Sequence, residues 1–104
     1  MSYPPAPSNI GKRGLAKAAS GKRIYFAIED EIHIPQSGRP DKLIYLQRLK
    51  FESDGRVELR LGYYVIGEKP AARARWVWGR FATMFPAHDF RSIIRRAERK
   101  GWLS

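Results

Sequence analysis

An Asp-Gly pair followed by a regular alternation of apolar and polar residues is the feature that most constrains the fold of this chain. Asp54 and Gly55 favour a tight turn, because glycine accepts the positive φ that a short hairpin loop demands. Beyond the turn every second residue is apolar, as in a strand with one buried and one wet face; these residues are Val57, Leu59, Leu61, Tyr63 and Val65. The pattern predicts an antiparallel hairpin of strands 43–51 and 57–65.

Two further segments are typical of strands. Residues 24–34 are mostly apolar on both sides of an acidic triplet at 29–31, which predicts one long strand or two short ones. Residues 76–85 are apolar on both faces of an extended chain, so one of those faces needs a partner. Within strand 43–51 the apolar phase changes, and this change predicts a bulge near Gln47.

The C-terminal segment predicts an amphipathic helix. Pro86 suits the first turn, and Gly101 can end the helix in the left-handed conformation. Between them the apolar residues recur at the spacing of one helical face; they are Phe90, Ile93, Ile94 and Ala97. Strands followed by one helix predict an α+β domain. We expect an antiparallel sheet of about four strands that the C-terminal helix covers on one face, with the opposite face free.

Positive charge is concentrated at the two ends of the chain, whose formal net charge is +10. Residues 1–23 hold five basic and no acidic side chains, together with many Pro, Gly, Ala and Ser residues. So little apolar material predicts a flexible basic tail before a single domain at 24–104. The tail is interpreted as a phosphate-binding arm or a plain solubilising extension; its prolines and glycines argue against an organellar transit peptide.

The rest of the composition bears on location. No cysteine is present, which fits a reducing compartment. No apolar run approaches the roughly 20 residues of a spanning helix, and the start of the chain lacks the apolar centre of a secretory signal. We therefore expect a soluble, cytoplasmic protein without a membrane partner.

The most informative functional segment interleaves arginine with tryptophan between positions 73 and 80. Guanidinium groups attract phosphate and indole rings stack on unpaired bases, so the segment predicts contact with single-stranded DNA or RNA. Trp76 and Trp78 share one side of an extended chain, although core packing is the alternative role for both rings. The predicted contact residues are Arg48, Lys50, Arg60, Tyr64, Arg73, Arg75, Trp76, Trp78 and Arg80.

Two other function classes fit parts of the sequence. In an interaction module, the Trp-rich face would be a protein interface and the charge would dock an acidic partner. In a metal-dependent nuclease, Pro40-Asp41 would precede Glu58-Leu59-Arg60, but the arginine replaces a lysine and cannot transfer protons. His33 and His88 lack the spacing of metal ligands. We therefore predict no enzyme, no metal and no cofactor.

The half of the chain from the Asp-Gly turn onward resembles the single-stranded-DNA-binding domain of the positive cofactor four family of transcriptional coactivators and its bacterial relatives. The parallels are Leu59–Tyr64, the loop at 67–75, a strand at Gly79–Met84 and the helix Pro86–Ala97. The resemblance implies a four-stranded antiparallel sheet with one helix and homodimerisation through that C-terminal helix. It also implies a basic, concave sheet face that binds melted DNA.

Overall fold

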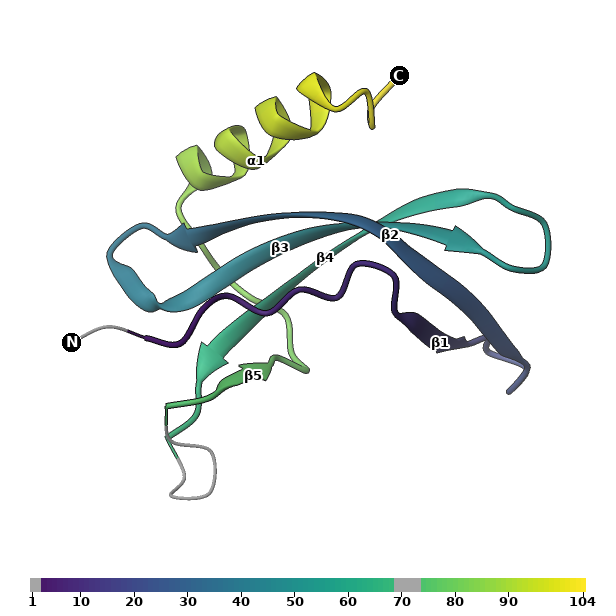
Figure 1. Cartoon of the computed structure of the whole chain (residues 1–104), viewed down its shortest axis with the longest axis horizontal. Coiled ribbons are helices and arrows are strands. Elements are labelled where there is room, and N and C mark those ends of the chain that lie inside the picture. Colours follow the sequence, from purple (N-terminus) through teal and green to yellow (C-terminus); the bar gives the residue numbers. More distant parts are fainter. Residues whose placement is uncertain (1–2, 69–73) are drawn as a thin grey trace.

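The computed structural model, which describes residues 3–68 and 74–104, is an antiparallel sheet with one C-terminal helix (Figure 1). The five strands lie in the order of the sequence, and each pairs antiparallel with the next. This arrangement confirms the predicted α+β class. The elements are β1 (Arg13–Lys17), β2 (Arg23–Gln36), β3 (Arg39–Phe51), β4 (Val57–Ile66), β5 (Trp76–Trp78) and α1 (Ala87–Arg99).

Helix α1 packs on one face of the sheet, over β2 and β3 (Figure 1). Ile93 and Ala97 of the helix are fully buried against Ile32, Ile44 and Leu46 of the sheet. These two helical residues are four positions apart, so they share the inner face of α1. We call the face of the sheet under the helix the helix-side face.

Both ends of α1 are fixed by contacts that the sequence favours. Gly101 takes a φ of 76°, and the Trp102 N–H donates to the Ala97 carbonyl at 3.0 Å, as in a Schellman-type helix end. Near the N-terminus the buried Asp89 carboxylate accepts hydrogen bonds from the backbone N–H and hydroxyl of Ser37. The predicted helix and its glycine end are confirmed.

The opposite face of the sheet has its own core. Phe26 and Ile28 of β2 and Leu49 and Phe51 of β3 are buried there, beneath the β1 residue Ala16. The phase change in β3 therefore arises because its two ends contribute to cores on opposite faces of the sheet, one under α1 and the other beside β1. The predicted bulge near Gln47 is wrong: β3 pairs with β4 in unbroken register, and the irregularity lies in β2 between Ile28 and Asp30.

The predictions of a flexible tail at 1–23 and of a free second face are both wrong for the described residues. β1 adds an edge strand to β2, and residues 3–12 run across the second face. Pro7 accepts from the Tyr45 hydroxyl at 2.6 Å, and Pro4 accepts from Trp76 Nε1 at 2.8 Å. The segment is held by hydrogen bonds to the sheet, so it orders without an apolar core of its own. We call the covered face the inner face.

The acidic triplet does not interrupt β2, because its three side chains meet different partners. Glu29 pairs with Arg48 and Asp30 with Lys100. Glu31 lies on the inner face and accepts hydrogen bonds from the backbone and side chain of Asn9 and from Gln47. The acidic side chains of this one strand thus lie on both faces of the sheet. The Glu31 carboxylate holds the N-terminal segment on the sheet through its hydrogen bonds.

The last strand is much shorter than the predicted 76–85. β5 pairs with β4 only opposite Tyr64–Ile66, and residues 79–86 leave the sheet to reach α1. The expected strand at Gly79–Met84 is therefore also wrong. The chain must pass from the edge of the sheet to the helix-side face over these residues, which prevents them from continuing the ladder.

Replacing Glu31 by alanine should release the N-terminal segment, because three hydrogen bonds to the carboxylate are lost. Bonds to charged groups contribute about 1.5–3 kcal/mol each, and residual bonds to water reduce the sum. We expect faster tryptic cleavage after Lys12 and a lower melting temperature. Glu29→Ala is the matched control, since the partner of that carboxylate among the described residues is the partly exposed Arg48. Equal sensitivity of both variants would contradict this role of Glu31.

We predict that ionised Asp89 makes the stability of the fold sensitive to acid. Hydrogen bonds from the Ser37 hydroxyl and N–H lower the pKa of Asp89 below its ordinary value of 3.8. Because the pKa is lower in the folded state, the ionised carboxylate stabilises the fold fully at pH values above 3.8. This contribution is lost as the pH falls through the lowered pKa. Asp89→Asn should therefore unfold at lower urea concentration than the wild type at pH 7, and the gap should close in strong acid. Glu98→Gln, on the exposed side of α1, is the control.

Candidate nucleic-acid interface

Three of the predicted contact residues meet on the inner face. Arg60 and Tyr64 project from β4, and Trp78 projects from β5 opposite Tyr64. The Tyr64 and Trp78 rings meet edge to face with centroids 4.9 Å apart, and the Arg60 guanidinium carbon lies 5.4 Å from the Trp78 ring. Alternation along two neighbouring strands produces this grouping. We call these three residues the Arg60 cluster.

Glycine makes room for the indole ring of this cluster. Gly62 lies between Arg60 and Tyr64 on β4, and a Cβ at this position would overlap the Trp78 ring. The ring also lies 6.3 Å from the buried Tyr45 ring. Trp78 is therefore half-buried: one part of the ring packs on the sheet, and the remainder is accessible.

A polar network holds the Arg60 side chain. Its Nε donates to Gln47 Oε1 at 2.9 Å, and Gln47 Nε2 donates to Glu31 at 2.6 Å. Burial lowers the pKa of Arg60 from its ordinary value, whereas the Glu31 carboxylate acts in the opposite direction. The guanidinium stays protonated in proteins, so this position keeps a fixed positive charge.

A pocket of about 420 Å³ opens beside the Arg60 cluster, between β4 and the segment after β5. Two arginines, Arg60 and Arg80, are among its lining residues, and no acidic residue of the described chain is. Aromatic rings from Tyr63, Trp78 and Phe81 contribute to its walls. Cationic and aromatic residues with no carboxylate in the pocket wall form a site suited to an anion that carries a planar ring.

The other predicted residues of the loop region lie around this pocket or apart from it. Arg75 and Arg80 are exposed on either side of β5. Trp76 packs against the N-terminal segment, with its ring centroid 5.8 Å from that of Tyr3. The predicted contact at Arg73 lies outside the described residues.

Arg48 and Lys50 do not join the cluster. Both occupy positions of β3 that alternate with Leu49, so they project from the helix-side face. Arg48 is paired with Glu29 at 3.2 Å. The assignment of these two residues to the same surface as Arg60 is therefore wrong, because their position in the pleat puts them on the other side of the sheet.

Phe81 is the residue that sequence reasoning missed. Its side chain is 82% exposed and stands next to Arg80 at the pocket. The segment was interpreted as a strand, in which Phe81 would pack on a sheet face. An arginine followed by an exposed phenylalanine in the same basic segment was the signal that could have identified it.

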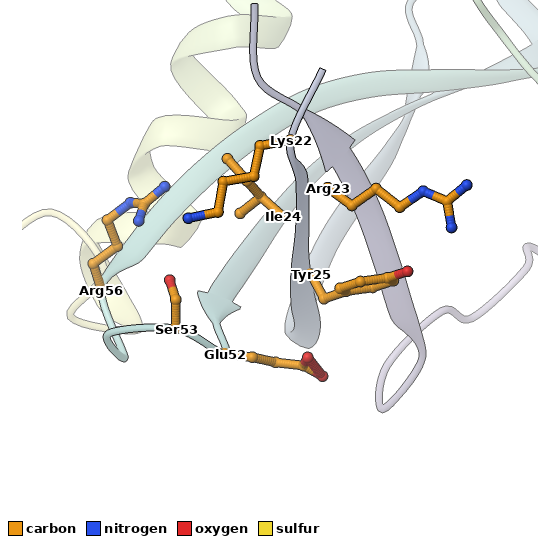
Figure 2. A pocket seen from close by; sticks show the side chains of 7 residues that line it. All are labelled: Lys22, Arg23, Ile24, Tyr25, Glu52, Ser53 and Arg56. Carbon is orange, nitrogen blue, oxygen red and sulfur yellow. The ribbon is translucent and has the colours of Figure 1, made fainter. Parts of the chain in front are cut away.

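A second basic hollow, of about 390 Å³, lies at the far end of the sheet between the start of β2 and the β3–β4 turn. Figure 2 shows Lys22 and Arg56 pointing into it, whereas Arg23 points away. Carboxylates already neutralise much of this site: Arg56 pairs with Asp54 and Glu58, and Glu52 is part of the lining. This hollow is therefore a weaker anion site than the pocket beside Arg60.

The residues of the nuclease hypothesis do not meet. Asp41 adjoins the Lys42–Val65 pair of the β3–β4 ladder, and Glu58 pairs with Leu49 farther along it. Seven positions separate Val65 from Glu58, a rise of roughly 23 Å. Asp41 is bound by Arg39 and Glu58 by Arg56. Within residues 3–68 and 74–104, no cluster of three acidic, histidine or cysteine side chains could hold a metal ion.

Comparison with known proteins finds no match: no family model, curated protein or solved structure is significantly similar to the chain. In the part of the chain that the structure describes, no helix has the length and apolar character needed to cross a membrane. The functional argument therefore depends on the geometry of the site.

Gly62→Ala should displace the Trp78 ring, because the added methyl group occupies the space of the indole. Overpacking of this kind costs about 1–3 kcal/mol. We expect a lower unfolding midpoint in urea and an altered tryptophan fluorescence spectrum. In a Trp78→Ala background the same glycine substitution should cost much less. An equal cost in both backgrounds would mean that the ring does not rest on Gly62.

Proposed function

We propose that this protein binds single-stranded nucleic acid, DNA or RNA, through the pocket beside the Arg60 cluster. The observation that carries the proposal is that Arg60 and Arg80 share a pocket with three aromatic rings and no acidic side chain. The net charge of +10 attracts polyanions over a longer range. The cysteine-free composition favours action in a reducing compartment such as the cytoplasm.

The exposed groups divide into phosphate and base contacts. Arg75 and Arg80 flank β5 and are accessible to a backbone that passes along this edge. Phe81 is exposed enough to stack on an unpaired base, whereas Trp78 can offer only the accessible part of its ring. A base in a duplex has both π-faces occupied by its neighbours, so this arrangement favours single strands.

The resemblance to the positive cofactor four family supports the same function. The resemblance assigns the surface that binds melted DNA to the region after the Asp-Gly turn. This region contributes β4, the residues around β5 and the pocket-lining segment 79–83. Membership of the family is itself a proposal.

The proposal predicts separable effects of Arg80→Ala and Phe81→Ala on binding. For single strands the slope of log affinity against log salt is about −0.7 per phosphate neutralised, so Arg80→Ala should flatten it by about 0.7. Phe81→Ala should weaken binding by about 1–3 kcal/mol and leave the slope unchanged. Fluorescence anisotropy with labelled single-stranded DNA, RNA and duplex DNA at several salt concentrations measures both effects.

Lys50→Ala is the control for charge, because this exposed lysine projects from the helix-side face. It should leave the salt slope unchanged. If Lys50→Ala and Arg80→Ala have equal effects, binding is diffuse and the pocket is not the site. A protein that binds none of the three probes at low salt but purifies in a stable complex with another protein would favour the interaction-module alternative.

A further inference from the structure

The outer edge of β4 is open over half of the strand. β5 covers only Tyr64–Ile66, and Figure 1 shows it beside the C-terminal end of β4 alone. Within the described residues no other strand pairs with this side of Val57–Gly62. An uncovered edge with a row of unpaired backbone groups is a template for another strand.

The hydrogen bonds at the β5 end of this edge show which backbone groups of β4 point outward. Gly79 N–H donates to the Tyr63 carbonyl at 2.8 Å, and Gly67 N–H donates to the Arg75 carbonyl at 3.0 Å. Odd-numbered residues of β4 therefore direct their N–H and C=O groups outward. By this alternation Val57, Leu59 and Leu61 present theirs along the open edge.

The side chains at this edge are unusually apolar for a strand in water. Val57, Leu59 and Leu61 project from the helix-side face, where α1 covers β2 and β3 instead, and they are 40%, 37% and 41% exposed. Native edge strands are normally protected by charge or short length. β1, the opposite edge, shows this protection: it has five residues and carries Arg13 and Lys17.

We propose that the β4 edge pairs antiparallel with the same edge of a second copy of this chain, with the two-fold axis at Leu59. In this register Leu59 faces Leu59 of the second copy, and Val57 faces Leu61. Each odd-numbered residue then meets an odd-numbered residue, so the outward N–H and C=O groups pair completely. Any two-fold axis that passes through a residue pairs odd-numbered residues with odd-numbered ones, whereas an axis between two residues does not.

Among these registers, the charged side chains favour the one with the axis at Leu59. With Leu59 on the axis, Glu58 of each copy faces Arg60 of the other on the inner face. Opposite charges directly across an antiparallel pair are favourable, and like charges are unfavourable. A dimer through the outer face of α1 would instead bring together the exposed arginines at 91, 95 and 99. The segment Val57–Leu61 is thus self-complementary in apolar side chains, backbone groups and charge.

Sedimentation velocity over a concentration series tests the assembly. The wild type should approach twice the 12.0 kDa protomer mass as concentration rises. Leu59→Lys should remain monomeric, because it places two ammonium groups at the axis. The control Leu15→Lys puts the same charge on an equally accessible leucine of β1 and should dimerise as the wild type does. A wild type that is monomeric up to about 1 mM overturns the proposal.

A second pair of variants tests the charge register. Glu58 and Asp54 both pair with Arg56, but only Glu58 lies within the proposed strand pair. Glu58→Lys should weaken the dimer at least about tenfold, and Asp54→Lys should not. Equal effects of the two substitutions would overturn the register.

Amide hydrogen exchange tests the proposed interface without any substitution. The amides of Leu59 and Leu61 should become protected only at concentrations where the dimer forms. If they exchange freely in a dimeric sample, or if Phe90→Lys on α1 dissociates the dimer while Leu59→Lys does not, the interface is on the helix and the proposal fails. Arg60 and Leu61 also line the pocket, so a dimer through this edge would restrict the access of nucleic acid to it. These measurements use no nucleic acid, so they test the dimer separately from the binding assay.

Discussion

The Glu31 carboxylate is the interaction on which the arrangement of the inner face depends. It binds Asn9 and Gln47, and Gln47 in turn binds Arg60. A partly buried carboxylate needs several donors, and here the donors come from the N-terminal segment and β3. Satisfying this one charge therefore orders the first residues of the chain and fixes the arginine beside the pocket.

Coverage of the two faces explains the distribution of apolar residues along the sheet. α1 protects one end of the helix-side face, and β1 protects the other end of the inner face. The long strands β2 and β3 cross between these two small cores, so each must be apolar on different faces at its two ends. β4 extends past both covers, which leaves its apolar row and its backbone edge accessible. The proposed dimer would bury the apolar row and pair the backbone groups of the edge.

Local patterns sufficed for several elements but only for part of the site. The Asp54-Gly55 turn, with Gly55 at a φ of 73°, and the helix with its Gly101 end are confirmed because neighbouring residues determine them. Alternation also grouped Arg60, Tyr64 and Trp78 correctly. It failed for Arg48 and Lys50, since their face follows from the register in which β3 pairs with β4, which places them opposite Leu59 and Val57. It failed for Phe81 because propensity cannot show where a strand leaves its ladder.

The sequence by itself determined the α+β class, the C-terminal helix, the strand β4 and the excess of positive charge, since short-range periodicity and composition encode these properties. Only the tertiary structure decided that the N-terminal segment covers the inner face, that Trp78 rests on Gly62, and that the β4 edge stays open. Each of these depends on contacts between residues far apart in the chain. Such contacts leave no periodic trace in the segments that make them.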